Sequence, residues 1–121
     1  MATITLSRMW YWSANKIQGV VVGEDDTVTL SQSYGRKNNA SLLHYSLALG
    51  ETLDTMLTVQ GRDVPGYILD SKRLKESVTV MPMTEALADA KDGGIYVLFE
   101  SGATHYANGT YRTDHVWKVR F

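Results

Sequence analysis

The chain has 121 residues, of which 44% are hydrophobic and 21% charged, a balance that suits one globular domain spanning residues 1–121 with its own core. Twelve Lys and Arg residues against thirteen Asp and Glu residues give a formal net charge of −1, so the chain as a whole has no strong attraction for a nucleic-acid polymer or an anionic membrane. The chain has no cysteine, which excludes disulfides, thiolate chemistry and cysteine zinc sites.

Targeting and membrane signals are also missing from the sequence. No apolar run approaches the roughly 18–20 residues of a membrane-spanning helix. The first residues, MATITLSRMWYW, lack the basic segment, apolar stretch and cleavage site of a signal peptide. We therefore expect a cytoplasmic protein with no membrane partner.

Three segments separated by short polar turns open the chain and predict an antiparallel meander. Thr3–Trp12 and Thr27–Ser33 alternate in polarity, and Ile17–Val22 is β-branched and apolar. Arg8 falls on the apolar side of the first segment. It either extends along the edge of the core or points into a concave site beside Trp10.

The next segment, Tyr34–Ser41, breaks this alternation. Its sequence, YGRKNNAS, combines a flexible glycine with the cation of Arg36 and the amides of Asn38 and Asn39. Because loops on rigid sheets commonly carry binding residues, it is a candidate binding loop. The alternative is a polar connector.

Residues 42–59 predict a hairpin, with strands at Leu43–Leu49 and Leu53–Val59 and a turn at Gly50. A helix is the rival interpretation, because the segment is rich in good helix formers. The strand is preferred because Gly50 would interrupt a helix.

The middle of the chain predicts two short helices. Gln60–Gly66 is predicted to be a loop, followed by a short strand at Tyr67–Leu69. Either Asp70 or Ser71 then suits the cap of a short helical turn through about Ser77. Glu85–Lys91 suits a second helix, with an acidic residue near its start and a basic one at its end.

The C-terminal stretch, Ile95–Phe121, predicts a β-meander. Asn108-Gly109 suits a type I′ turn, which would place Tyr106 opposite Tyr111 on one face of a hairpin. After it, apolar and basic residues alternate from Trp117 to the end, as expected of a half-buried strand. Together these elements predict an α+β fold, mainly antiparallel β-sheet with two short helices and a C-terminal β-meander.

The other face of the predicted hairpin gathers three groups that can carry charge. His105 faces Arg112, and Asp114 lies diagonally across from them. Arginine guanidinium groups bind phosphates bidentately, and aromatic faces stack on bases. The predicted ligand-binding residues are Arg8, Trp10, Arg36, Asn38, Asn39, His105, Arg112 and Asp114. The alternative is that the aromatic residues fill the core and the contacts between subunits.

Motifs for catalysis and cofactors are not found. The sequence has no phosphate-binding glycine loop, no GxGxxG and no GxSxG, and its three histidines lack the spacing of a metal motif. We expect no cofactor and no metal, and we favour a non-enzyme. His44-Tyr45-Ser46 matches half of the paired motif of 2H phosphoesterases. A small nucleotide phosphoesterase that uses His44 or His105 is therefore a possible function, ranked third after the two described next.

The layout resembles that of phage anti-Thoeris proteins, which sequester cyclic ADP-ribose signals. The resemblance rests on the meander Thr3–Ser33, the short helices near Ser71–Ser77 and Glu85–Lys91, and the strands of Ile95–Phe121. It implies a non-catalytic homo-oligomer in the cytosol of the host cell, with a nucleotide pocket shared between subunits, that blocks immune signalling. Arg112, in YRTD, would suit the phosphate-binding role. The alternative is a phage-type structural or adaptor protein with no small-molecule ligand.

Overall fold

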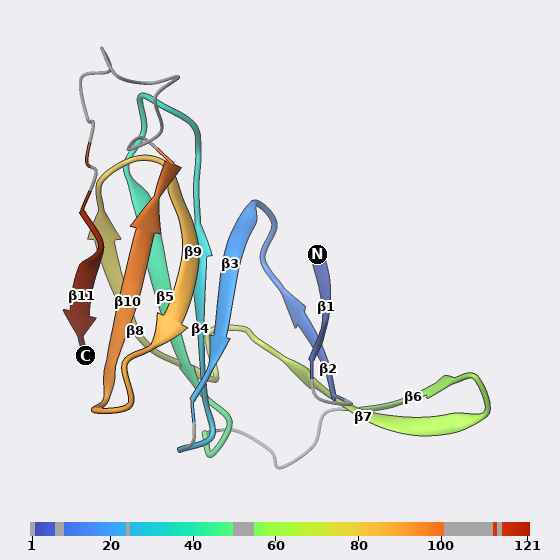
Figure 1. Cartoon of the computed structure of the whole chain (residues 1–121). Helices are drawn as coiled ribbons and strands as arrows, with labels where there is room; N and C mark the ends of the chain where they lie inside the picture. The colour runs from blue at the N-terminus through green and yellow to red at the C-terminus, as the bar shows by residue number, and fades with distance from the viewer. Residues whose placement is uncertain (1, 7–8, 24, 50–54, 101–112, 114) are drawn as a thin grey trace.

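The computed structural model describes residues 2–6, 9–23, 25–49, 55–100, 113 and 115–121. Every regular element within these ranges is a β-strand (Figure 1). The strands are β1 Ala2–Leu6, β2 Met9–Ser13, β3 Ile17–Val22, β4 Thr27–Gln32, β5 Ala40–Ser46, β6 Thr55–Val59, β7 Arg62–Ile68, β8 Leu74–Val80, β9 Thr84–Asp89, β10 Gly94–Phe99 and β11 Trp117–Arg120.

These strands form three sheets. The N-terminal sheet has the order β1-β2-β7-β6, the central sheet β3-β4-β5-β8 and the C-terminal sheet β11-β10-β9. All neighbouring strands are antiparallel except β2 and β7, which run parallel. The hairpin of β6 and β7 extends away from the other two sheets (Figure 1).

The central sheet is buried on both faces, and the alternation of its side chains explains why. On β4, Val28 and Leu30 are fully buried against the N-terminal sheet, while on β5 Leu42 is fully buried against the C-terminal sheet. Burying each such side chain contributes about 1.5–3 kcal/mol relative to leaving it exposed. The residues between them point to the opposite face, so both faces of the sheet are covered.

Two clusters of apolar side chains result. The first, between the central and N-terminal sheets, contains Tyr11, Val28, Leu30, Tyr45 and Leu69. The second, between the central and C-terminal sheets, contains Leu42, Ile95, Val97 and Phe99.

The central and C-terminal sheets meet along one side, where β3 packs closely against β9 (Figure 1). A Cβ atom at Gly19 would lie 2.2 Å from the carbonyl oxygen of Glu85, so only glycine fits there. The Ser31 hydroxyl donates a hydrogen bond of 2.9 Å to the same carbonyl.

Arg73 joins the N-terminal and central sheets from inside the protein, with only 2% of its surface exposed. Its Nη1 donates to the carbonyls of Leu47 and Leu49, both at 2.8 Å. Its guanidinium lies 5.1 Å from the ring centre of Tyr67 on β7. A buried cation is thus satisfied by backbone carbonyls and an aromatic face.

The prediction of an α+β fold with two helices is wrong, because the described residues contain no helix. Asp70 does cap a turn, since its carboxylate accepts from the Lys72 amide and its carbonyl from the Arg73 and Leu74 amides. The turn ends there, and β8 pairs with the edge of β5 instead of continuing as a helix over Ser71–Ser77. Glu85–Lys91 likewise falls largely in β9, which pairs with β10. Pairing with a neighbouring strand overrides the helix propensity of these residues.

The predicted pairing of the early strands is also partly wrong. β3 and β4 form the expected hairpin, but Thr3–Trp12 splits into β1 and β2, which pair with each other and with β7. The strands predicted within residues 42–59 are present as β5 and β6. Among the described residues they do not pair with each other, because β5 lies between β4 and β8, and β6 pairs with β7.

Gln60–Gly66, predicted to be a loop, lies mostly in β7. Pro65 is tolerated there because β2 pairs with β7 only from Gly66 to Ile68, so that Pro65 has a neighbouring strand on one side.

The C-terminal strand is present as β11, paired with β10. The predicted turn at Asn108-Gly109 lies outside the described residues. Within the described ranges there is no helix that is long and apolar enough to cross a membrane.

Candidate functional site

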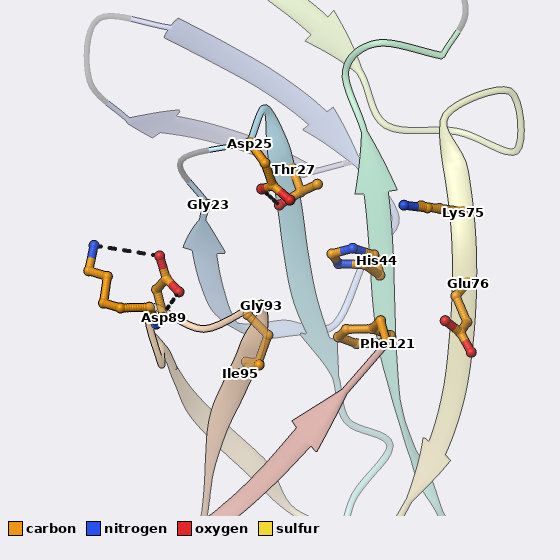
Figure 2. Close-up of a pocket in the computed structure, with 12 residues that line it drawn as sticks. Gly23, Asp25, Thr27, His44, Lys75, Glu76, Asp89, Gly93, Ile95 and Phe121 are labelled. Carbon is orange, nitrogen blue, oxygen red and sulfur yellow. Dashed lines mark hydrogen bonds and ion pairs between the residues drawn. The ribbon is translucent and has the colours of Figure 1, made fainter.

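A cleft of about 420 Å³ opens between the central and C-terminal sheets, at the end where β3 finishes and β10 begins. Figure 2 shows it, with His44 and Phe121 at its centre. We call it the His44 cleft. Its lining residues are Gly23, Asp25, Thr27, His44, Lys75, Glu76, Asp89, Lys91, Gly93, Gly94, Ile95 and Phe121.

His44 lies on β5, on the same face as Leu42, and only 8% of its surface is exposed. A hydrogen bond of 2.8 Å joins its Nδ1 atom to Oγ1 of Thr29 on the neighbouring strand. Its ring stacks on that of Phe121, with 4.2 Å between centroids and 6° between planes. The ring is therefore held from two sides.

These surroundings keep the His44 ring neutral. Burial lowers the pKa of His44, and the nearby Lys75 lowers it further, while Asp25 and Glu76 act in the opposite direction. Among the described residues Nε2 has no hydrogen-bond partner, and His44 lines the cleft. We infer that Nε2 faces the cleft, where it can bond a ligand.

Lys75 reaches the same cleft because of an irregularity in β8. Glu76 pairs with His44 and Leu74 with Tyr45, so Lys75 is an extra residue between two successive pairs. In a regular strand Lys75 and Glu76 would point to opposite faces. The β-bulge allows both to line the cleft. Among the described residues the Lys75 ammonium forms no hydrogen bond or ion pair.

Asp25 is fixed at the rim by the turn that joins β3 to β4. The Thr27 hydroxyl donates a hydrogen bond of 2.6 Å to its Oδ1 atom, and this bond lowers the pKa of Asp25. Gly23 makes room for the pair, since a Cβ there would lie 2.5 Å from Thr27 Oγ1 and 2.7 Å from Asp25 Oδ1.

The opposite wall comes from the turn between β9 and β10. Asp89 accepts a hydrogen bond of 2.8 Å from the Lys91 amide and forms an ion pair of 3.5 Å with its ammonium. Gly93 has φ +87°, a conformation that favours glycine. Because Asp89 and Lys91 form an ion pair within their own wall, Asp25, Lys75 and Glu76 are the charges more available to a ligand.

Four of the eight residues predicted to bind a ligand cannot be placed. Arg8, His105, Arg112 and Asp114 lie outside the described residues. Trp10 belongs to β2, in the N-terminal sheet, where it pairs with Thr5 and Gly66.

The remaining three predicted residues lie in the loop between β4 and β5. Arg36 lines a second, smaller cleft of about 270 Å³, at the opposite ends of β3 and β4 from the His44 cleft. Asn38 and Asn39 are exposed, and the Asn38 side chain donates to the Tyr34 carbonyl at 3.0 Å, which shapes the loop itself. None of the three lines the His44 cleft.

Asp25, Lys75 and Phe121 were not predicted to be site residues. The sequence predicts that Asp25 is part of a solvated turn and that Phe121 is the end of a strand. Nothing in the sequence marks the bulge at Lys75, because it depends on the register between β5 and β8.

No protein family model, no curated protein and no solved structure matches this chain. The resemblance to anti-Thoeris proteins stays a prediction, and the two short helices among its supports are strands or turns.

Proposed function

We propose that the protein is a non-catalytic binding protein that takes up a small anionic ligand of nucleotide type in the His44 cleft. The observation that carries this proposal is the β-bulge that brings Lys75 to the cleft beside the neutral edge of His44. An ammonium with no ion pair in the part of the chain that the structure describes, together with a neighbouring hydrogen-bonding nitrogen, suits a phosphate group.

The size and lining of the cleft support the same function. Its volume of about 420 Å³ falls in the usual range of small-molecule sites, roughly 300–1,000 Å³. Ile95 and Phe121 add apolar surface beside the polar groups, as is typical of sites that hold a ring and an anion together.

Binding without turnover is favoured by the surroundings of His44. Its Nδ1 is bonded to a hydroxyl, Thr29 Oγ1, whereas catalytic histidines are commonly oriented by a carboxylate. The biological role that we propose is sequestration of a cyclic ADP-ribose-like signal in the cytosol of the host cell, which blocks its immune signalling.

Titration calorimetry with adenosine 5′-monophosphate, ADP-ribose and cyclic ADP-ribose tests the proposal. We expect Lys75→Met to weaken binding about tenfold or more, because a charge-assisted hydrogen bond is lost. Lys72→Met, which removes an exposed lysine outside the cleft, is the matched control and should bind as the wild type does. Equal affinity of all three proteins for every ligand would refute the proposed site.

Chromatography of the same mixtures separates binding from catalysis. We expect the ligands to be recovered unchanged. Turnover that disappears in His44→Ala would replace sequestration by the phosphoesterase function.

A second candidate, a structural or adaptor protein, is favoured by one observation. Tyr96 and Leu98 lie on the outward face of β10 and are 41% and 47% exposed. Exposed apolar side chains that share a face often mark a protein contact. A purified protein whose spectrum shows no co-purified nucleotide near 260 nm, and that has no affinity for any nucleotide, would favour this candidate.

A further inference from the structure

We propose that Asp25 makes the His44 cleft selective for ligands that carry hydroxyl donors beside their anionic group, as a ribose phosphate does. This inference, which rests on the proposed binding function, names the class of ligand. It follows from how charge is divided across the cleft and from how firmly the Asp25 carboxylate is held.

The charges that the cleft offers to a ligand have both signs: the Lys75 ammonium and the carboxylates of Asp25 and Glu76. Figure 2 shows the Asp25 carboxylate and the Lys75 ammonium on either side of the His44 ring. Both groups are close enough to His44 to act on its protonation, and Lys75 also acts on Asp25. A simple anion would be repelled by the carboxylate, and a simple cation would be repelled by the ammonium. A ligand that presents an anion to one side and hydrogen-bond donors to the other satisfies both.

The Asp25 carboxylate is held in place. Thr27 donates to Oδ1, and the lack of a side chain at Gly23 lets this pair lie against the backbone. The Asp25 backbone amide also donates to this carboxylate. A carboxylate has about four lone-pair sites, so it can still accept bonds from ligand donors.

Hydroxyl pairs are the donors that this arrangement suits best. A carboxylate commonly accepts hydrogen bonds from the ribose hydroxyls of bound nucleotides. A ligand ammonium would also bond to Asp25, but it would be repelled by Lys75 in the same cleft. Neutral hydroxyls carry no such penalty.

The test compares three ligands by titration calorimetry: adenosine 5′-monophosphate, its 2′,3′-dideoxy counterpart and inorganic phosphate. We expect the wild type to bind the ribonucleotide at least tenfold more tightly than the dideoxynucleotide, because hydrogen bonds to a charged group are lost. Asp25→Asn should reduce this preference to about twofold or less, while the dideoxynucleotide still binds. Asp63→Asn, which changes an exposed carboxylate on the β6–β7 hairpin, should keep the full preference.

A second variant moves the carboxylate without removing it. In Gly23→Ala the new Cβ would lie 2.7 Å from Asp25 Oδ1, so the pair must shift and the preference should narrow. Equal affinity of the wild type for both nucleotides, or a full preference retained in Asp25→Asn, would overturn the inference while leaving the proposed function intact. Failure of all three ligands to bind the wild type would overturn both.

Discussion

At the scale of single residues, His44 should make the stability of the protein depend on pH. Its pKa is lowered by burial, so between the folded pKa and the unfolded value of about 6.5 only the unfolded state binds a proton. The contribution of neutral His44 to the free energy of unfolding is therefore complete above about pH 6.5, and it is lost as the pH falls toward the folded pKa. We expect the midpoint temperature of thermal unfolding to decrease as the pH is lowered from 7.5 to 5.

Variants at two histidines assign this effect. His44→Gln should flatten the pH dependence of the midpoint over that interval, measured by differential scanning fluorimetry. His115→Gln, which changes an exposed histidine, should leave it as in the wild type. Parallel curves for wild type and His44→Gln would show that His44 does not titrate differently on unfolding.

Arg73 is the residue whose loss should cost most stability. Arg73→Met keeps much of the side-chain volume but leaves the carbonyls of Leu47 and Leu49 without the donor that Arg73 supplies. We expect the free energy of unfolding to fall by about 3 kcal/mol in urea denaturation. Lys72→Met, at the exposed neighbouring position, should change it by less than about 0.5 kcal/mol. A similar, small change in both variants would contradict the role of Arg73 in joining the two sheets.

At the scale of elements, the contact between β3 and β9 depends on Gly19. Gly19→Ala would place a Cβ 2.2 Å from the Glu85 carbonyl oxygen, so the strands must move apart. We expect a loss of roughly 2 kcal/mol in the free energy of unfolding, measured in urea. Gln18→Ala, an exposed change on the same strand, is the control. Stability equal to the wild type in Gly19→Ala would mean that the two strands do not meet so closely.

Strands were predictable from the sequence where polarity alternates clearly, as in β4 and β11, or where a run is β-branched and apolar, as in β3. The two helices were predicted from a capping residue before Ser71–Ser77 and from the charges at the ends of Glu85–Lys91. The sequence does not show that these segments pair with β5 and β10 as strands. Pairing between segments that are distant in the sequence, such as β2 with β7, could likewise not be predicted.

The candidate site was hardly predictable for the same reason. His44 was considered only for a three-residue motif, yet its role follows from contacts with Thr29 and Phe121, which lie 15 and 77 positions away in the sequence. Local pattern can suggest a binding loop, but it cannot show which side chains converge from three different strands.

At the scale of the whole molecule, we expect a homo-oligomer. Three tryptophans and seven tyrosines are many for a chain of 121 residues, and Leu98, Val116 and Trp117 remain 47–59% exposed. The outer edges of β8 and β11 pair with no other strand among the described residues, and such edges are usually covered. Multi-angle light scattering should give at least twice the mass of one chain. A monomer at micromolar concentration would contradict this prediction.

The most direct test of the His44 cleft as a binding site is a nuclear magnetic resonance titration of isotope-labelled protein with adenosine 5′-monophosphate. The amide signals of Gly23, Thr27, His44, Gly93 and Gly94 should shift together and saturate with one dissociation constant, because these residues line the cleft from both sheets. The signals of the β6–β7 hairpin should stay in place. Shifts confined to that hairpin or to the Arg36 loop, or no shifts at millimolar ligand, would contradict the assignment of the ligand site to this cleft.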